Sequence, residues 1–176
     1  MRYDQSKGMN AYEWIRDSGE KELADVFWKY GEERYSRRIA RAIVSARKSE
    51  DIRTTYQLAE IINKSIPKSD PNKNNSTRTF QAIRIFINKE LDVLREALKD
   101  TYKILAPKGR LVLITYHSLE DRVIKDFLIH TDESKSLPKK IPIKDNFLLK
   151  MFNLISKSVK PTKTEIDSNN RARSAK

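Results

Sequence analysis

The sequence predicts an α/β fold in which helices dominate and the sheet is incomplete. The run 111–114 is apolar at every position. A strand that helices cover on both faces has this pattern, whereas a strand with one solvent-exposed face alternates apolar and polar residues. We therefore predict a buried strand at 110–115. The only other strand candidate is the segment 154–159. Two strands do not make a stable sheet with both faces covered.

Helical periodicity predicts several short helices before this strand. We expect helices at 11–16, 19–30 and 32–48, with Ser18 capping the second and Gly31 ending it. The apolar residues of the second helix recur at intervals of three and four, which places them on one face. That face is the first candidate for a helical core.

A fourth helix, a polar loop and a long helix follow in the sequence. Thr54 or Thr55 caps the fourth helix. The segment 67–76 is rich in Pro, Asn, Ser, Asp and Lys, a composition that predicts a loop. Across 77–105 the apolar residues step by three and four without a break, so we predict one continuous helix that Pro107 stops.

The chain is strongly basic. Its 176 residues carry a formal net charge of +12, with 34% charged and 38% hydrophobic residues. This balance indicates a polyanionic partner, first nucleic acid and second an anionic membrane surface, although a lysine-rich proteome gives the same excess without any ligand. Two basic segments contribute to it, a proline-containing connection at 131–150 and the tail from Lys160 onward.

Composition also excludes several classes of site. The chain has no cysteine, so disulfides, thiolate metal sites and cysteine nucleophiles are excluded. It has no run of ~18 apolar residues that could cross a membrane, and no apolar signal region at its N-terminus. We expect a cytoplasmic protein with no membrane contact and no metal.

The turn 116–122 leads from the predicted strand into a helix, the place where an open α/β sheet binds its ligand. Ser118 followed three residues later by Asp121 resembles a capping box. That purely structural interpretation explains Ser118 and Asp121 but not His117, which could orient or deprotonate a substrate. We take His117, Ser118 and Asp121 as candidate catalytic residues, with a structural histidine as the alternative for His117.

Four arginines fall on one face of the predicted third helix: Arg34, Arg37, Arg38 and Arg41. A stripe of guanidinium groups on a basic chain fits contacts with an RNA phosphate backbone. The alternative is that nearby acids neutralise the stripe: Glu32, Glu33 and Asp25. On the long helix, a polar edge either reads a base or hydrogen-bonds a loop: Gln81, Arg84 and Asn88.

The glycines argue against a cofactor cradle in this chain. A dinucleotide or S-adenosylmethionine needs a tight glycine-rich turn after a strand, so that the backbone can approach the cofactor closely. The four glycines are isolated, and no predicted strand precedes the first three: Gly8, Gly19, Gly31 and Gly109. The sequence therefore offers no cofactor-binding residues.

Five ordered segments resemble the signature segments of a bacterial enzyme family, the small-subunit rRNA (cytosine-N4)-methyltransferases called RsmH or MraW. These segments are 2–4, 31–43, 77–84, 116–122 and 171–176. The resemblance implies a Rossmann-like methyltransferase domain that a helical insertion interrupts. It also implies methyl transfer from S-adenosylmethionine to the exocyclic amine of a cytidine in the decoding region of 16S rRNA.

The resemblance implies a division of the chain. Residues 1–88 correspond to the helical insertion, which helps to recognise the substrate, and residues 89–176 to the C-terminal part of the methyltransferase domain. The family's glycine-rich cofactor loop precedes the segment matched by Arg2, and Tyr3 stands where the family usually has methionine. We therefore expect an N-terminally truncated member or fragment in which the cofactor-binding half is absent.

The resemblance also implies two groups of site residues. One group contacts small-subunit rRNA or shapes the substrate pocket: Arg37, Arg38, Arg41, Gln81 and Arg84. The other lies on the rim of the pocket: His117, Ser118 and Asp121. Three hypotheses remain open. The chain is an enzyme whose missing part another polypeptide supplies, a basic helical RNA-binding remnant without catalysis, or a decayed gene product.

Overall fold

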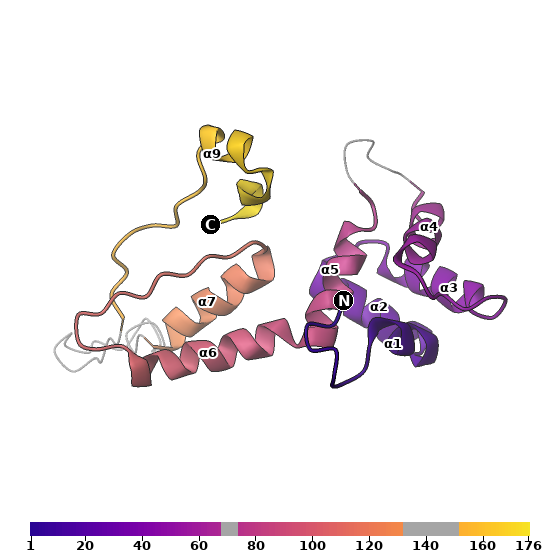
Figure 1. Cartoon of the computed structure of the whole chain (residues 1–176), viewed down its shortest axis with the longest axis horizontal. Helices are drawn as coiled ribbons and strands as arrows, with labels where there is room; N and C mark the ends of the chain where they lie inside the picture. Colours follow the sequence, from indigo (N-terminus) through magenta and orange to yellow (C-terminus); the bar gives the residue numbers. More distant parts are fainter. Residues whose placement is uncertain (68–73, 132–151) are drawn as a thin grey trace, which may run out of the picture. The chain divides into compact units, whose positions relative to one another are not determined.

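The structure, a computed structural model, describes residues 1–67, 74–131 and 152–176 (Figure 1). The chain divides into two compact units, Met1–Glu90 and Leu91–Lys176. The predicted boundary after residue 88 lies close to this division. That the units are a helical insertion and part of a methyltransferase domain stays a prediction.

Two predicted segments lie largely or wholly outside the described residues. The loop 67–76 is described only at its ends, and the connection 131–150 only at its first residue. Among the described residues, no helix is long and apolar enough to cross a membrane.

The first unit is built from five helices, which Figure 1 labels: α1 (Ala11–Asp17), α2 (Glu20–Gly31), α3 (Ser36–Ala46), α4 (Thr55–Ser65) and α5 (Thr77–Asn88). The apolar faces of these helices form one core, in which α2 packs against both α3 and α5. The indole of Trp14 meets the ring of Phe27 edge-on at 6.0 Å and lies 4.9 Å from the ring of Phe86. The core closes within this unit.

Helix starts in this unit follow local side-chain chemistry, with one exception. Thr54 caps α4 and forms a capping box with Gln57, as the sequence predicts. The predicted cap Ser18 is wrong, because α2 starts after Gly19 without a side-chain cap. Ser18 instead ends α1, and its hydroxyl donates to the carboxylate of Glu22 at 3.0 Å. The third helix is also shorter than the predicted 32–48, since α3 spans only Ser36–Ala46.

Packing, rather than backbone conformation, explains why the last residue of α2, Gly31, is a glycine. The residue with a left-handed backbone is Glu32, at φ 50°. A Cβ on Gly31 would lie 2.6 Å from the backbone oxygen of Arg78 in α5. The absence of a side chain therefore lets α2 and α5 approach closely.

The predicted continuous helix 77–105 is wrong, because the chain breaks at Lys89. Helix α5 ends at Asn88, Lys89 has φ 51°, and α6 (Glu90–Ile104) begins at the next residue. The Asn88 side chain accepts a hydrogen bond from the Tyr3 amide at 2.8 Å and donates to the Met1 carbonyl at 2.9 Å. Contacts with the chain's first residues therefore stabilise a break that the apolar periodicity does not show.

The second unit contains α6, α7 (Ser118–His130), α9 (Lys163–Ser168) and a short 3₁₀ helix, η2 (Asn170–Ser174). Helices α6 and α7 lie side by side through aromatic contacts (Figure 1). The Tyr102 ring of α6 lies 5.6 Å from the Phe127 ring of α7 and 5.2 Å from the Phe152 ring. Leu98, Leu119 and Val123 are the buried apolar residues near this cluster in the sequence.

The predicted buried strand 110–115 is wrong for the described residues, which contain no strand. Val112 is 81% exposed and Ile114 66% exposed, whereas Thr115 is buried. The second candidate, 154–159, is likewise irregular, and its apolar side chains are exposed. The physical reason is that an apolar segment becomes a buried strand only beside neighbouring strands. The Rossmann-like sheet thus stays a prediction.

We predict that Gly31→Ala destabilises the first unit by about 1–3 kcal/mol, because its Cβ would collide with the Arg78 carbonyl of α5. Both tryptophans of the chain lie in this unit, so urea unfolding followed by tryptophan fluorescence reports on it. Gly19→Ala is the control: a Cβ there meets nothing within 4 Å, and we expect less than about 1 kcal/mol. Equal stability of the two variants would contradict the packing argument.

Candidate functional site

The predicted arginines do occupy one exposed surface. Arg34 lies just before α3, and Arg37, Arg38 and Arg41 lie on the exposed side of that helix. The opposite side of α3 is fully buried in the core of the first unit: Ile39, Ala40 and Ile43. Core packing therefore determines which face presents the guanidinium groups. We call these four arginines the α3 arginine face.

Acidic residues neutralise little of the α3 arginine face. Arg41 pairs with Glu20 of α2 at 3.4 Å, and both side chains are largely exposed. Glu33, one of the predicted acidic partners, is 4% exposed and accepts a hydrogen bond from the Tyr35 amide at 2.9 Å. Within the described part of the chain, no hydrogen bond or ion pair holds the other three arginines. The face keeps most of its positive charge.

Gln81 and Arg84 make contacts inside the first unit. The Gln81 amide donates to the Tyr30 carbonyl at the end of α2, at 3.5 Å. Arg84 donates two hydrogen bonds to the Glu90 carboxylate, at 2.9 and 3.1 Å, and Glu90 also accepts from the Tyr3 hydroxyl. Through these contacts both residues connect parts of the first unit. Their predicted place near a substrate pocket stays a prediction.

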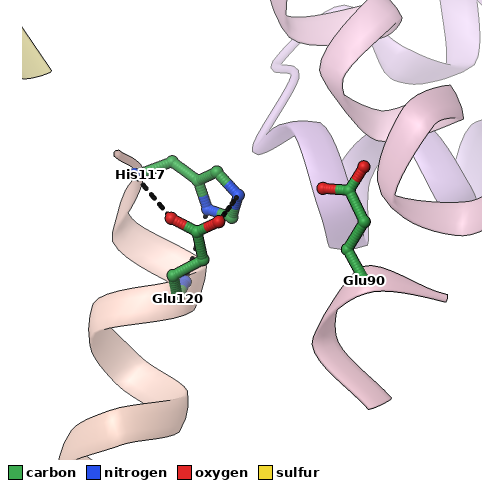
Figure 2. Close-up of side chains that lie close together, drawn as sticks. All are labelled: Glu90, His117 and Glu120. Carbon is green, nitrogen blue, oxygen red and sulfur yellow. Dashed lines mark hydrogen bonds and ion pairs between the residues drawn. The ribbon is translucent and has the colours of Figure 1, made fainter. Parts of the chain in front are cut away.

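The start of α7 differs from its predicted form by one residue. The N-cap is His117, and Glu120 completes the capping box, so the predicted pair of Ser118 and Asp121 is not the box. The His117 Nδ1 accepts a hydrogen bond from the Glu120 amide at 3.3 Å (Figure 2). The Glu120 carboxylate accepts from the amides of Tyr116 and His117, at 2.7 and 3.3 Å. Ser118 is the first residue of the helix.

This arrangement determines what His117 can do. Because Nδ1 accepts a hydrogen bond, the neutral imidazole carries its proton on Nε2. The His117 side chain is 9% exposed, and its Nε2 lies 3.2 Å from Oε1 of Glu120 without hydrogen-bond alignment. In this tautomer His117 offers a donor and has no free base nitrogen. The Nε2 atom is itself buried and has no hydrogen-bond partner among the described residues, so the geometry leaves His117 no base nitrogen with which to deprotonate a substrate.

The two acidic residues at the start of α7 are held in their charged forms. Burial by itself would raise the pKa of Glu120, but the nearby His117 side chain and the hydrogen bonds from the Tyr116 and His117 amides outweigh it and lower this pKa. Asp121 receives a hydrogen bond from Lys125 at 2.8 Å, which lowers the pKa of Asp121, with Lys176 adding to the effect. Both charges are favourable at a helix N-terminus.

The sequence places Glu120 at the positive end of the helix dipole and Lys176 in the basic tail, but sequence reasoning did not predict the contacts that either residue makes. The signal for Glu120 was present, because His117 and Glu120 have the same spacing as Ser118 and Asp121. Lys176 left no local signal. It lies 55 residues from Asp121 in sequence and reaches it only through the fold.

We predict that Glu120→Gln lowers the stability of α7 by about 1 kcal/mol at neutral pH. The lowered pKa of Glu120 stabilises the fold above its ordinary value of 4.5, and this contribution disappears as the pH falls through the lower, folded value. The protection factors of the α7 amides, which correct for the intrinsic pH dependence of exchange, should therefore fall on acidification in the parent chain and less in the variant. The exposed Glu96→Gln is the control, and equal acid responses in E120Q and the parent would contradict the prediction.

Comparison with known proteins tests the resemblance. The family model described as the MraW methylase family matches residues 1–176. A protein named ribosomal RNA small subunit methyltransferase H from Legionella pneumophila (strain Corby) is 45% identical over 175 residues, which cover 99% of this chain and 57% of that protein. Proteins of the same name from Buchnera aphidicola subsp. Cinara cedri (strain Cc) and Nitrosococcus oceani are also 45% identical, and 58% and 56% of their lengths are covered.

The chain therefore spans little more than half the length of these relatives. The match nevertheless extends over the whole of this chain, including both units and both groups of candidate residues. It confirms the family that the five sequence segments indicated. The chain belongs to the MraW methylase family.

Proposed function

We propose that this chain is the RNA-binding, substrate side of an rRNA methyltransferase. The reaction would transfer a methyl group from S-adenosylmethionine to N4 of a cytidine in the decoding region of 16S rRNA. The α3 arginine face carries the proposal, because it is an exposed positive surface with little acidic neutralisation in a member of this family. The names of the relatives, which are small-subunit rRNA methyltransferases, support the substrate class.

The chemistry explains why such a reaction needs a firm hold on RNA. The lone pair on cytosine N4 is conjugated with the ring, so the amine must be aligned closely with the methyl donor. The base must also leave its stack to reach an enclosed site. Arg37, Arg38 and Arg41 would hold the phosphates of the flanking strand, because guanidinium groups match phosphate geometry.

The remaining candidates would act closer to the base. In the first unit, Gln81 and Arg84 would contact the substrate RNA, and in the second unit, Ser118 and Asp121 would act at the start of α7. His117 would donate a hydrogen bond from Nε2, in agreement with its tautomer. Each of these roles rests on the family resemblance together with the position of the residue in its own unit.

The described residues do not fit S-adenosylmethionine. The cofactor needs glycines in a turn after a strand, and every glycine here has another environment. Gly31 is packed against α5, Gly19 caps α2, and Gly109 packs against the backbone of Ala106. Gly8 lies in an exposed segment at φ 75°. We propose that cofactor binding requires residues that the relatives have beyond the matched share.

A second candidate function is RNA binding without catalysis. The same α3 arginine face supports it, and so does the poor fit to the cofactor. The two functions differ in one observable property. If the chain is part of an enzyme, adding the share of the relatives' length that it does not match would give cofactor binding, whereas a binding module would hold RNA in either case.

We predict that the chain alone does not bind S-adenosylmethionine, because it has no glycine turn that could admit the cofactor. Isothermal titration should show no saturable binding tighter than about 100 μM, which corresponds to about 5.5 kcal/mol. A full-length relative titrated in parallel is the positive control. Saturable binding by this chain below that limit would overturn the assignment of the cofactor site to residues outside it.

We predict that binding of the chain to 16S rRNA fragments weakens with salt, and that Arg37→Ala with Arg41→Ala flattens the log-log slope by roughly one to two units. Each phosphate contact on a single strand contributes about 0.7 to this slope. The control removes the same charge from exposed positions of α6, as Arg95→Ala with Lys99→Ala, and should leave the slope nearly unchanged. An unchanged slope with a lowered Tm in the first variant would show that the arginines are structural.

A further inference from the structure

The segment that follows α9 returns to the start of α7. Its 3₁₀ helix η2 is closed by backbone hydrogen bonds from Ala172 to Asn169 and from Ala175 to Ala172, at 2.9 and 2.8 Å. Ala172 is 7% exposed, and η2 packs against α9. Lys176, which follows this turn, contacts residues on both sides of His117 in the sequence.

Lys176 holds the residue where the turn into α7 begins. Its backbone amide donates to the Thr115 carbonyl at 2.9 Å, and its carbonyl accepts from the Thr115 amide at 3.0 Å. Two reciprocal bonds of this kind form a closely paired bridge, as between antiparallel strands. Thr115 is 5% exposed, whereas Lys176 is an exposed residue. The two bonds fix the backbone two residues before His117.

Lys176 also reaches the first turn of α7. Its Nζ lies 3.5 Å from Oδ2 of Asp121, which Lys125 contacts at 2.8 Å. One residue therefore touches both ends of the span 115–121. Between those two ends lie His117 and Glu120, whose side chains form the capping box (Figure 2).

We propose that Lys176 is a positioning residue for His117. By pairing with Thr115 and Asp121 it holds the span 115–121 in the conformation in which Nδ1 of His117 accepts from the Glu120 amide. His117 then keeps its proton on Nε2 and presents a hydrogen-bond donor. That this donor serves methyl transfer rests on the proposed function, whereas the positioning itself concerns the free chain.

The competing conformation shows why an external anchor is needed. Ser118 and Asp121 have the spacing of a second capping box, one residue further along the chain. A helix that started there would release the His117 ring from the Glu120 amide. Pairing of Lys176 with Thr115 favours the observed register, because it fixes the backbone two residues before the His117 cap.

The test uses the ¹⁵N signals of the histidine rings in the full chain. The chain has two histidines, and His130, in the last turn of the same helix, is an internal reference. Lys176→Pro removes the amide that donates to Thr115 together with the ammonium group, Lys176→Met removes only the ammonium group, and Lys176→Arg retains both. Lys163→Met, at an exposed position of the tail, is the matched control.

We expect the parent, K176R and K163M to show a single His117 tautomer with the proton on Nε2. In K176P the two ring nitrogens of His117 should shift toward averaged values, while His130 and the helical circular dichroism stay unchanged. Exchange of the Glu120 amide should accelerate by about 5- to 30-fold in K176P, and by less in K176M.

Two results would overturn the proposal. One is a His117 spectrum and Glu120 exchange rate in K176P equal to those of the parent. The other is a loss of helical signal in K176P together with unchanged Glu120 exchange in K176M, which would make the segment a merely structural support. Neither readout requires cofactor or RNA, so failure of the proposed function leaves this test intact.

Discussion

The first unit depends on the close approach of α2 and α5 at Gly31. The Arg78 carbonyl lies closer to this position than a side chain would allow, so α2 can seat its buried face directly on α5. Helix α3 packs against another part of α2 and turns Ile39 and Ile43 into the same core. With these residues inside, the arginines of α3 have no place but the surface. The packing of α2 against α5 and α3 thus forms the core and also places the α3 arginine face on the surface.

The electrostatics of α3 are unfavourable in isolation. Arg37 and Arg38 lie in the first turn, where the helix dipole favours acidic residues, and neighbouring guanidinium groups repel one another. The buried carboxylate of Glu33 accepts a backbone hydrogen bond from Tyr35 just before this turn, yet three of the four arginines have no acidic partner among the described residues. A phosphate backbone would remove this repulsion, which is the physical basis for placing RNA on this surface.

Sequence patterns predicted the structure where local chemistry decides it. Apolar periodicity located the helices, and Thr54 was recognisable as a cap. The patterns failed where distant residues decide. Lys89 breaks an uninterrupted apolar periodicity at the point where Met1 and Tyr3 form hydrogen bonds with Asn88. The apolar run 111–114 indicates burial correctly only when neighbouring strands exist.

The start of α7 shows the same limit within a single turn. Both His117 with Glu120 and Ser118 with Asp121 have capping-box spacing, so the spacing alone does not decide between the two registers. The structure adopts the first, and Lys176 anchors Thr115 beside it.

The two units differ in how far they bury their apolar side chains. The first closes its own core, whereas the second leaves Val112 and Ile114 exposed, and burying such a side chain stabilises a fold by about 1.5–3 kcal/mol. Under the proposed function, RNA would bind to the unit that closes its own core, while methyl transfer would require further residues that cover Val112 and Ile114.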